Sequence, residues 1–205
     1  MDTYLTLAFE AAAELTEKKS VFIASTAPVS NENEAIAFID KIKKSHPDAG
    51  HNVYAYRIGL VHVYEKYSDD GEPSGTAGVP ALSVLKKENV TNAVVVVTRY
   101  FGGILLGAGG LVRAYLAACK AGVDAAGIVT KRLAQVLSVT VPYAVIGRLQ
   151  RDAPAGGYEI VGASYAENAE LIIRTPIANA DAVIRRVADL SNGAAAVVKK
   201  DRVYV

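Results

Sequence analysis

An acidic, glycine-rich segment at residues 68–78 contains the first side chains that could carry chemistry. It reads Ser-Asp-Asp-Gly-Glu-Pro-Ser-Gly-Thr-Ala-Gly and precedes an expected helix. Its candidate binding residues are Asp69, Asp70, Glu72, Ser74 and Thr76. The free amides at the start of a helix suit an anion, whereas the carboxylates suit a hard cation such as Mg²⁺. A structural role is the alternative, because this sequence favours a turn and either hydroxyl can cap the helix.

A second glycine-rich segment, residues 98–113, lies between a valine-rich stretch and a long alanine-rich one. Its candidate binding residues are Arg99, Tyr100, Gly102, Gly103, Gly107, Gly109, Gly110 and Arg113. Glycine allows close approach of the backbone to a ligand, and arginine suits two-point contacts with phosphate or carboxylate. The spacing matches neither G-x-G-x-x-G nor the Walker A pattern. The alternatives are tight packing of a strand on a helix and salt bridges from either arginine to the acidic segment.

The third segment, Gly-His-Asn-Val-Tyr-Ala-Tyr at residues 50–56, places a histidine at the start of a strand. His51 is a candidate general base or ligand contact, although a lone histidine near a turn is more often an ordinary hydrogen-bonding residue. Asn52 and Tyr56 join it as candidate binding residues. Tyrosines near these segments can stack on the bases of single-stranded RNA, or they can pack in the core.

Composition narrows the class of protein. The chain has 205 residues, 51% of them hydrophobic, and a net charge of +1, so no general coating of polyanions is indicated. Residues 131–205 carry 10 basic and 7 acidic side chains, which is compatible with a face that meets RNA or an acidic protein. Cys119 is the only cysteine, which excludes an intrachain disulfide and a cysteine zinc site. Because no signal peptide or membrane-length apolar run is found, we expect a cytoplasmic protein with a reduced thiol in a helix core.

Hydrophobic periodicity predicts two successive patterns of strands and helices. The first contains strands at residues 4–9, 21–27, 51–58, 60–67 and 93–98, and helices at 32–44, 79–87 and 111–126. Asn31 and Glu34 form a capping pair for its first helix. A boundary falls near residues 127–130. Beyond it come strand 133–141, helix 143–152, strands 158–165 and 169–175, helix 180–190 with Asn179 as its cap, and strand 195–203, which is the ferredoxin-like order β-α-β-β-α-β.

Together these segments resemble the YigZ/IMPACT family. The matching stretches are residues 18–24 (Lys-Lys-Ser-Val-Phe-Ile-Ala), 50–56, 68–78 and 97–115. Val53 departs from the family, whose members often have cysteine there, and this speaks against an essential thiol at that position. The resemblance implies an α/β (α+β) protein. Its first domain, residues 1–128, would be a two-layer fold like domain 2 of ribosomal protein S5, and its second, residues 131–205, a ferredoxin-like domain similar to one of elongation factor G.

The resemblance also implies a role in translation, because eukaryotic relatives regulate translation by interfering with activation of the amino-acid-starvation kinase. The leading hypothesis is therefore a cytoplasmic, non-enzymatic regulatory factor that binds RNA or proteins of the translation machinery. It needs no cofactor, no membrane partner and no specific DNA sequence. Arg99, Arg113 and the glycine-loop amides would contact phosphates.

Two other hypotheses remain open. The protein could be an enzyme acting on a small phosphorylated or carboxylated substrate, with Asp70 or Glu72 holding Mg²⁺ or a proton and Arg99 neutralising the substrate's charge. It could also be a protein–protein adaptor. The two glycine-rich loops decide part of this question. If mutual salt bridges saturate them, the site is structural, and if Arg99 is left free at a helix N-terminus, it binds a ligand.

Overall fold

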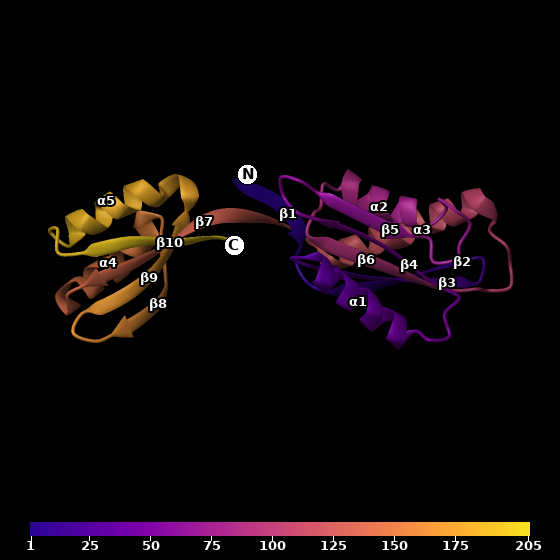
Figure 1. Ribbon diagram of the computed structural model, residues 1–205, viewed down its shortest axis with the longest axis horizontal. Coiled ribbons are helices and arrows are strands. Elements are labelled where there is room, and N and C mark those ends of the chain that lie inside the picture. The colour runs from indigo at the N-terminus through magenta and orange to yellow at the C-terminus, as the bar shows by residue number, and fades with distance from the viewer. The chain divides into compact units, whose positions relative to one another are not determined.

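The computed structural model describes all 205 residues and divides them into two units, each built on an antiparallel sheet. The first unit comprises Met1 and residues 3–130, and the second comprises Asp2 and residues 131–205. The chain is therefore an α+β protein of two parts (Figure 1). None of its helices combines the length and the hydropathy that crossing a membrane requires.

The sheet of the first unit has the strand order β2-β3-β6-β4-β5, with every neighbouring pair antiparallel. Its central strand is the valine-rich stretch for which the sequence predicted a strand, and these valines alternate between two buried apolar clusters, one on each face. The strands are β2 (Ala11–Glu17), β3 (Ser20–Pro28), β4 (His51–Ile58), β5 (Tyr64–Ser68) and β6 (Ala93–Tyr100).

Helices cover both faces of this sheet. α2 (Gly78–Lys87) and α3 (Gly107–Ala126) pack on one face, and α1 (Glu32–Ser45) packs on the other, as Figure 1 shows. The unit therefore has three layers rather than the two that the resemblance implied. The reason is the apolar stripe of α1, which includes Phe38 and Ile39 and buries the face formed by Val94 and Val96.

The predicted capping pair of α1 is confirmed. The side chain of Asn31 accepts a hydrogen bond from the Glu34 backbone amide at 3.0 Å, and the Glu34 carboxylate accepts from the Ser30 amide at 2.7 Å. Acidic residues occupy the first turn and Lys43 and Lys44 the last, as the helix dipole favours. This helix thus satisfies its own N-terminus with neighbouring side chains.

Three local predictions need correction. β2 was missed, because its Ala-Ala-Ala-Glu-Leu-Thr-Glu sequence has weak strand preference and is held by pairing with β3 along its whole length. β5 begins at Tyr64 rather than at residue 60, since Gly59 turns the chain with a positive φ. α3 begins at Gly107, so three glycines expected in a loop form its first turn.

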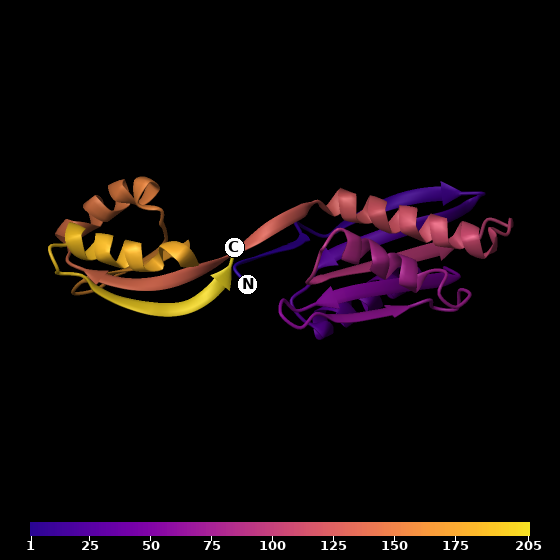
Figure 2. The ribbon, with the colours of Figure 1, turned by 90° about the horizontal axis from the view of Figure 1, so that it is seen from above.

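The second unit has the predicted order of strands and helices, with strands arranged β10-β7-β9-β8. β1 (Thr3–Leu7) also pairs with β7. Figure 2 shows both helices on one face of this sheet, over a core that includes Leu137, Leu171 and Val187. The elements are β7 (Ile128–Val141), α4 (Tyr143–Gly156), β8 (Glu159–Tyr165), β9 (Ala169–Pro176), α5 (Ala180–Leu190) and β10 (Ala196–Tyr204).

The capping role expected of Asn179 is wrong. Asn179 precedes α5 but its side chain caps no amide. A short 3₁₀ turn, Ile177–Asn179, leads directly into the helix, so Asn179 has helical backbone angles instead of the extended ones from which a side chain reaches back to the helix.

Candidate functional site

A buried carboxylate lies at the centre of the predicted polar site. Oε1 of Glu72 accepts hydrogen bonds from Nη1 of Arg99 and from the hydroxyl of Tyr115, each at 2.7 Å, and lies 3.9 Å from Nε2 of His51. Glu72 and Arg99 are 7% and 6% exposed. Burial, followed by the hydrogen bond to Glu72, raises the pKa of Tyr115. The salt bridge considered from sequence therefore exists for Arg99.

Sheet register explains why these side chains meet. Arg99 lies opposite His51 of β4 on one side and opposite Phe22 of β3 on the other. The three residues therefore share the sheet face that α2 and α3 cover. The Arg99 guanidinium lies 5.4 Å from the ring centre of Phe22 and 5.7 Å from that of Phe101, so aromatic rings flank the ion pair.

The acidic segment fixes the orientation of His51. Nδ1 of His51 lies 2.9 Å from the backbone oxygen of Asp70, and because a carbonyl oxygen only accepts, Nδ1 carries the proton in the neutral ring. Nε2 is then left as an acceptor on the side of Glu72. The Asp70 carboxylate itself accepts from Lys43 Nζ at 2.9 Å and from the Asn52 amide at 2.6 Å. Asp70 is thus a positioning residue, held between α1 and β4.

Asp69 closes the N-terminus of α2. Its carboxylate accepts from the amides of Ala77 at 3.1 Å, Gly78 at 2.8 Å and Gly75 at 2.9 Å. Burial acts to raise the pKa of Asp69, but these three amides outweigh it and hold the pKa below its usual range. The chain thus supplies its own anion to this helix.

The capping role expected of Ser74 or Thr76 is absent. The cap comes from Asp69 instead, and the Thr76 hydroxyl donates to the Pro73 carbonyl at 2.6 Å rather than receiving a helix amide. Ser74 is exposed. The three carboxylates of the segment serve different partners, and no group of three or more His, Cys, Asp or Glu side chains is placed to hold a metal ion.

The second glycine-rich segment is arranged differently. α3 has no side-chain cap at Leu106 and no acidic residue in its first turn. Gly107 has φ +69°, and a Cβ on Gly109 would lie 3.6 Å from an Arg113 guanidinium nitrogen, so this exposed cation covers the first turn. No carboxylate lies within salt-bridge distance of Arg113. Gly110 completes the turn.

These groups enclose a cleft of about 430 Å³, called the His51 cleft below. Its polar lining comes from His51, Glu72 and Arg99, and its apolar wall includes Phe101 and Leu105. The last two are 57% and 83% exposed. Gly107 and Ala108 bring the first turn of α3 to the same cleft. Arg113 lines two neighbouring grooves instead.

Four further predicted residues have packing roles. The buried Asn52 side chain accepts from the Thr98 hydroxyl at 2.7 Å. Tyr56 lies on the opposite sheet face, beneath α1, and the Tyr100 hydroxyl contacts Nδ1 of His46 at 2.8 Å. A Cβ on Gly102 would lie 2.0 Å from the backbone of Lys19, so close strand packing requires this glycine, whereas Gly103 has open space around it.

Sequence reasoning missed two members of the site. Tyr115 lies seven residues after Ala108 on α3, a spacing that returns to nearly the same helix face, so helical periodicity could have found it. Ser20 Oγ accepts from the Gly102 amide at 3.2 Å and lies 3.4 Å from Nη2 of Arg99. Nothing in the local sequence of Ser20 announces that contact.

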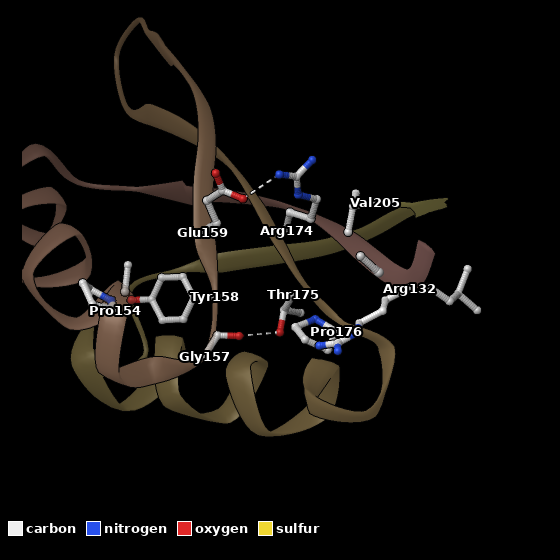
Figure 3. Close-up of a pocket in the computed structure, with 12 residues that line it drawn as sticks. Arg132, Pro154, Gly157, Tyr158, Glu159, Arg174, Thr175, Pro176 and Val205 are labelled. Atoms are coloured by element: carbon white, nitrogen blue, oxygen red, sulfur yellow. Dashed lines mark hydrogen bonds and ion pairs between the residues drawn. The ribbon is translucent and has the colours of Figure 1, made fainter. Parts of the chain in front are cut away.

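The second unit contains a separate cavity of about 370 Å³ (Figure 3). Around it, Arg174 pairs with Glu159 at 2.6 Å and the Thr175 hydroxyl donates to the Gly157 carbonyl at 2.9 Å. Tyr158 and several proline and aliphatic side chains supply the rest of its lining. Most of its polar groups are thus already paired.

Fold and site together define a two-domain α+β protein whose first domain holds a cleft over a buried carboxylate–arginine pair. Residues 18–123 match the family model described as the Impact N-terminal domain, and residues 139–194 match a domain of unknown function, DUF1949. The chain belongs to the IMPACT family. The resemblance found in the sequence is confirmed.

Individual proteins and solved structures are similar to this chain. IMPACT family member YvyE of Bacillus subtilis is 38% identical over 205 residues, covering 100% of this chain and 94% of that protein. IMPACT family member YigZ of Escherichia coli is 46% identical over 48% of this chain and 49% of its own length. A crystal structure described as a hypothetical protein is 30% identical over 98% of both chains, with a TM-score of 0.65. The structure of Yih1, described as a two-domain translational regulator, is 29% identical over 59% of this chain and 46% of its own, with a TM-score of 0.37.

Proposed function

We propose that this protein is a translation-associated factor that binds RNA at the end of the first domain where α3 begins. The observation that carries the RNA contact is a surface where exposed apolar side chains adjoin unpaired positive charge. Phe101 and Leu105 are exposed and line the His51 cleft. Leu106 lines both that cleft and a neighbouring groove, whose charged residues are Glu17, Lys18 and Arg113. Exposed aromatic rings stack on bases, and such cations contact phosphates.

Family membership supports the translation part of the proposal. The second domain supports it through its architecture. Its strand order β10-β7-β9-β8, with two helices on one face, favours the ferredoxin-like assignment and the likeness to a domain of elongation factor G. The likeness to domain 2 of ribosomal protein S5 remains part of the same proposal for the sheet with α2 and α3, to which α1 adds the third layer.

The test is RNA binding measured by fluorescence anisotropy over a series of salt concentrations. Arg99 is unsuitable for mutation because it is buried against Glu72, so the variant is Arg113→Gln, with Lys44→Gln as the control that removes one charge at the exposed end of α1. We expect Arg113→Gln to weaken binding severalfold and to lower the salt slope by about one, with Lys44→Gln unchanged. Binding that ignores salt, or that both variants weaken equally, would contradict the proposal.

One observation favours an enzyme as the second candidate. In the neutral ring of His51, the Asp70 carbonyl holds the proton on Nδ1 and leaves Nε2 as an acceptor, in a cleft whose volume suits a small molecule. In this alternative His51 accepts a proton from a small phosphorylated or carboxylated substrate, and Asp70 positions the ring rather than reacting. A metabolite thermal-shift screen with and without Mg²⁺ tests it. An unchanged melting temperature with every compound would remove this candidate.

A further inference from the structure

We propose that the first turn of α3 is a phosphate subsite, and that the His51 cleft takes a nucleotide phosphate, either of a free mononucleotide or of an RNA chain. The inference rests partly on the proposed function, because it names the group that RNA would present and the amides that would hold it. It also stands without RNA if the ligand is a free nucleotide.

The three helices of the first unit differ in how their N-termini are satisfied. α1 is capped by Asn31, and α2 receives the carboxylate of Asp69. α3 is the longest of the three, with 20 residues, and has neither a capping side chain nor an acid in its first turn. The first amides of a helix lack partners within the helix and carry partial positive charge. At α3 the chain provides no anion for them.

A positive charge lies beside the first turn of α3. Arg113 lies over Gly109, at the positive end of the helix, where a cation is unfavourable. Glu17 and Glu88 line the grooves beside it, but neither forms an ion pair with Arg113, and the first turn of α3 has no acidic residue. The basic residues of α1, in contrast, occupy the favourable last turn. Arg113 lines the neighbouring grooves rather than the His51 cleft, so a phosphate held by the amides would offset its charge across the turn without touching it. Local rules of this kind are most often broken where a ligand completes the arrangement.

Arg99 provides an observation that does not depend on the helix. Arg99 is 6% exposed and lines the same cleft, yet its Nε is buried without any hydrogen-bond partner. A buried N–H left unpaired costs roughly 1–3 kcal/mol. Glu72 occupies Nη1, and the only contact of Nη2 is the 3.4 Å one to Ser20. The Nε edge of the guanidinium, which suits a two-point contact with an oxyanion, is therefore the part that the protein leaves unsatisfied.

The apolar wall of the His51 cleft indicates what the phosphate is attached to. An inorganic ion would leave the apolar wall formed by Phe101 and Leu105 in water, where these side chains are mostly exposed. A cleft of about 430 Å³ is within the usual range for small ligands. A nucleotide fits both features, because its base can stack on Phe101 while its phosphate reaches the first turn of α3.

The experiment is calorimetric titration of the full chain at constant ionic strength with three probes: inorganic phosphate, uridine monophosphate and uridine. We expect saturable binding of the nucleotide, at least tenfold tighter than that of phosphate, and no binding of the nucleoside. The decisive variant is Ala108→Asp, which places a carboxylate in the first turn of α3. Ala37→Asp is its control, an exposed alanine on α1, across the sheet.

Ala108→Asp should reduce nucleotide affinity at least tenfold, and Ala37→Asp should change it less than twofold. An acid in the first helical turn favours the helix, so the melting temperature of Ala108→Asp without ligand should not fall, and lost binding would not reflect unfolding. Absence of nucleotide binding to the wild type, or equal affinities of the two variants, would overturn the inference.

A parallel titration with a short oligouridylate separates this inference from the proposed function. If uridine monophosphate binds and the oligonucleotide binds no more tightly, the subsite stands with a free nucleotide as its ligand, and RNA binding fails. If the oligonucleotide binds equally well to both variants while the mononucleotide does not bind, RNA binding stands and the subsite fails.

Discussion

The first turns of α2 and α3 lie on the same face of one sheet, and each follows a glycine-rich loop. Only the first turn of α2 receives a capping carboxylate from the chain. At α2, Asp69 places its carboxylate on the amides of Ala77 and Gly78. At α3, no side chain caps the first turn and no acidic residue lies in it, and Gly107 and Ala108 line the His51 cleft. A glycine-rich loop before a helix therefore does not reveal a binding site by itself. The presence or absence of an internal carboxylate separates a structural loop from a candidate ligand site.

The acidic loop before α2 also positions the side chains of the cleft beside α3. With Asp69 fixing the segment to α2 and Asp70 fixing it to α1 and β4, Glu72 is carried to Arg99, and His51 is turned toward both. We therefore interpret the acidic loop as the rigid frame of the site and the first turn of α3 as its binding element.

Removing the ion pair that joins the two regions should have the largest effect. Glu72→Ala leaves the Arg99 guanidinium buried without a counter-charge, which typically costs about 3–5 kcal/mol. We expect a loss of that size in the free energy of unfolding, measured by urea denaturation. Adding Arg99→Met should recover part of the loss, because both buried charges are then gone. A single-variant loss below about 1 kcal/mol would show that the pair is not buried as described.

Removing the carboxylate that caps α2 should have the next largest effect on stability. Asp69→Ala removes three hydrogen bonds to a charged acceptor and the cap of α2, so we expect a loss of about 2 kcal/mol in the free energy of unfolding. The matched control is Asp48→Ala, an exposed aspartate whose loss should change stability by no more than about 0.5 kcal/mol. Equal effects of the two substitutions would mean that Asp69 does not cap α2.

The charge on Asp69 should make this cap depend on pH. Because the pKa of Asp69 is lowered in the folded state, its contribution to stability is present above the unfolded pKa of about 3.9 and is lost as the pH falls through the folded pKa. We expect the difference in unfolding free energy between wild type and Asp69→Asn to be constant near pH 7 and to shrink below about pH 4. Urea denaturation from pH 2 to pH 7 measures it, and a difference that grows on acidification would contradict the sign.

Adding a carboxylate to the first turn of α3 should have the smallest effect on stability. Ala108→Asp gives α3 the carboxylate that α2 already has, so without ligand we expect a gain of about 0.3–1 kcal/mol, measured by urea denaturation at low salt. The gain should fall as salt is added, because this exposed charge is screened. A loss of stability would mean that the first turn of α3 is not electropositive.

Much of this architecture follows from the sequence, for reasons that particular residues show. The valines of β6 and the stripe of α1 repeat at the periods of a buried strand and an amphipathic helix, so both elements were predicted. β2 could not be predicted, because its strand structure depends on pairing with β3 rather than on its own side chains. Periodicity also fails at Gly107, since glycine carries no apolar signal at the start of α3.

The sequence predicted which residues belong to the candidate site better than it predicted the contacts that each of them makes. The ion pair of Arg99 and Glu72 was among the alternatives, because the sequence supplies both charges. Their choice of partner depends on sheet register and on the path of the acidic loop. The same holds for Asp69, whose carboxylate caps a helix that begins nine residues later. Contacts between residues so far apart in sequence are set by tertiary structure rather than by local preference.

The contrast between the two helices can be tested most directly by recording the backbone amide NMR signals of the ¹⁵N-labelled chain during titration with inorganic phosphate at constant ionic strength. We expect saturable shifts for the amides of Gly107, Ala108 and Gly109, with those of Ala77 and Gly78 unchanged because Asp69 already accepts their hydrogen bonds. Equal shifts at both helices, or none at residues 107–109, would contradict this expectation.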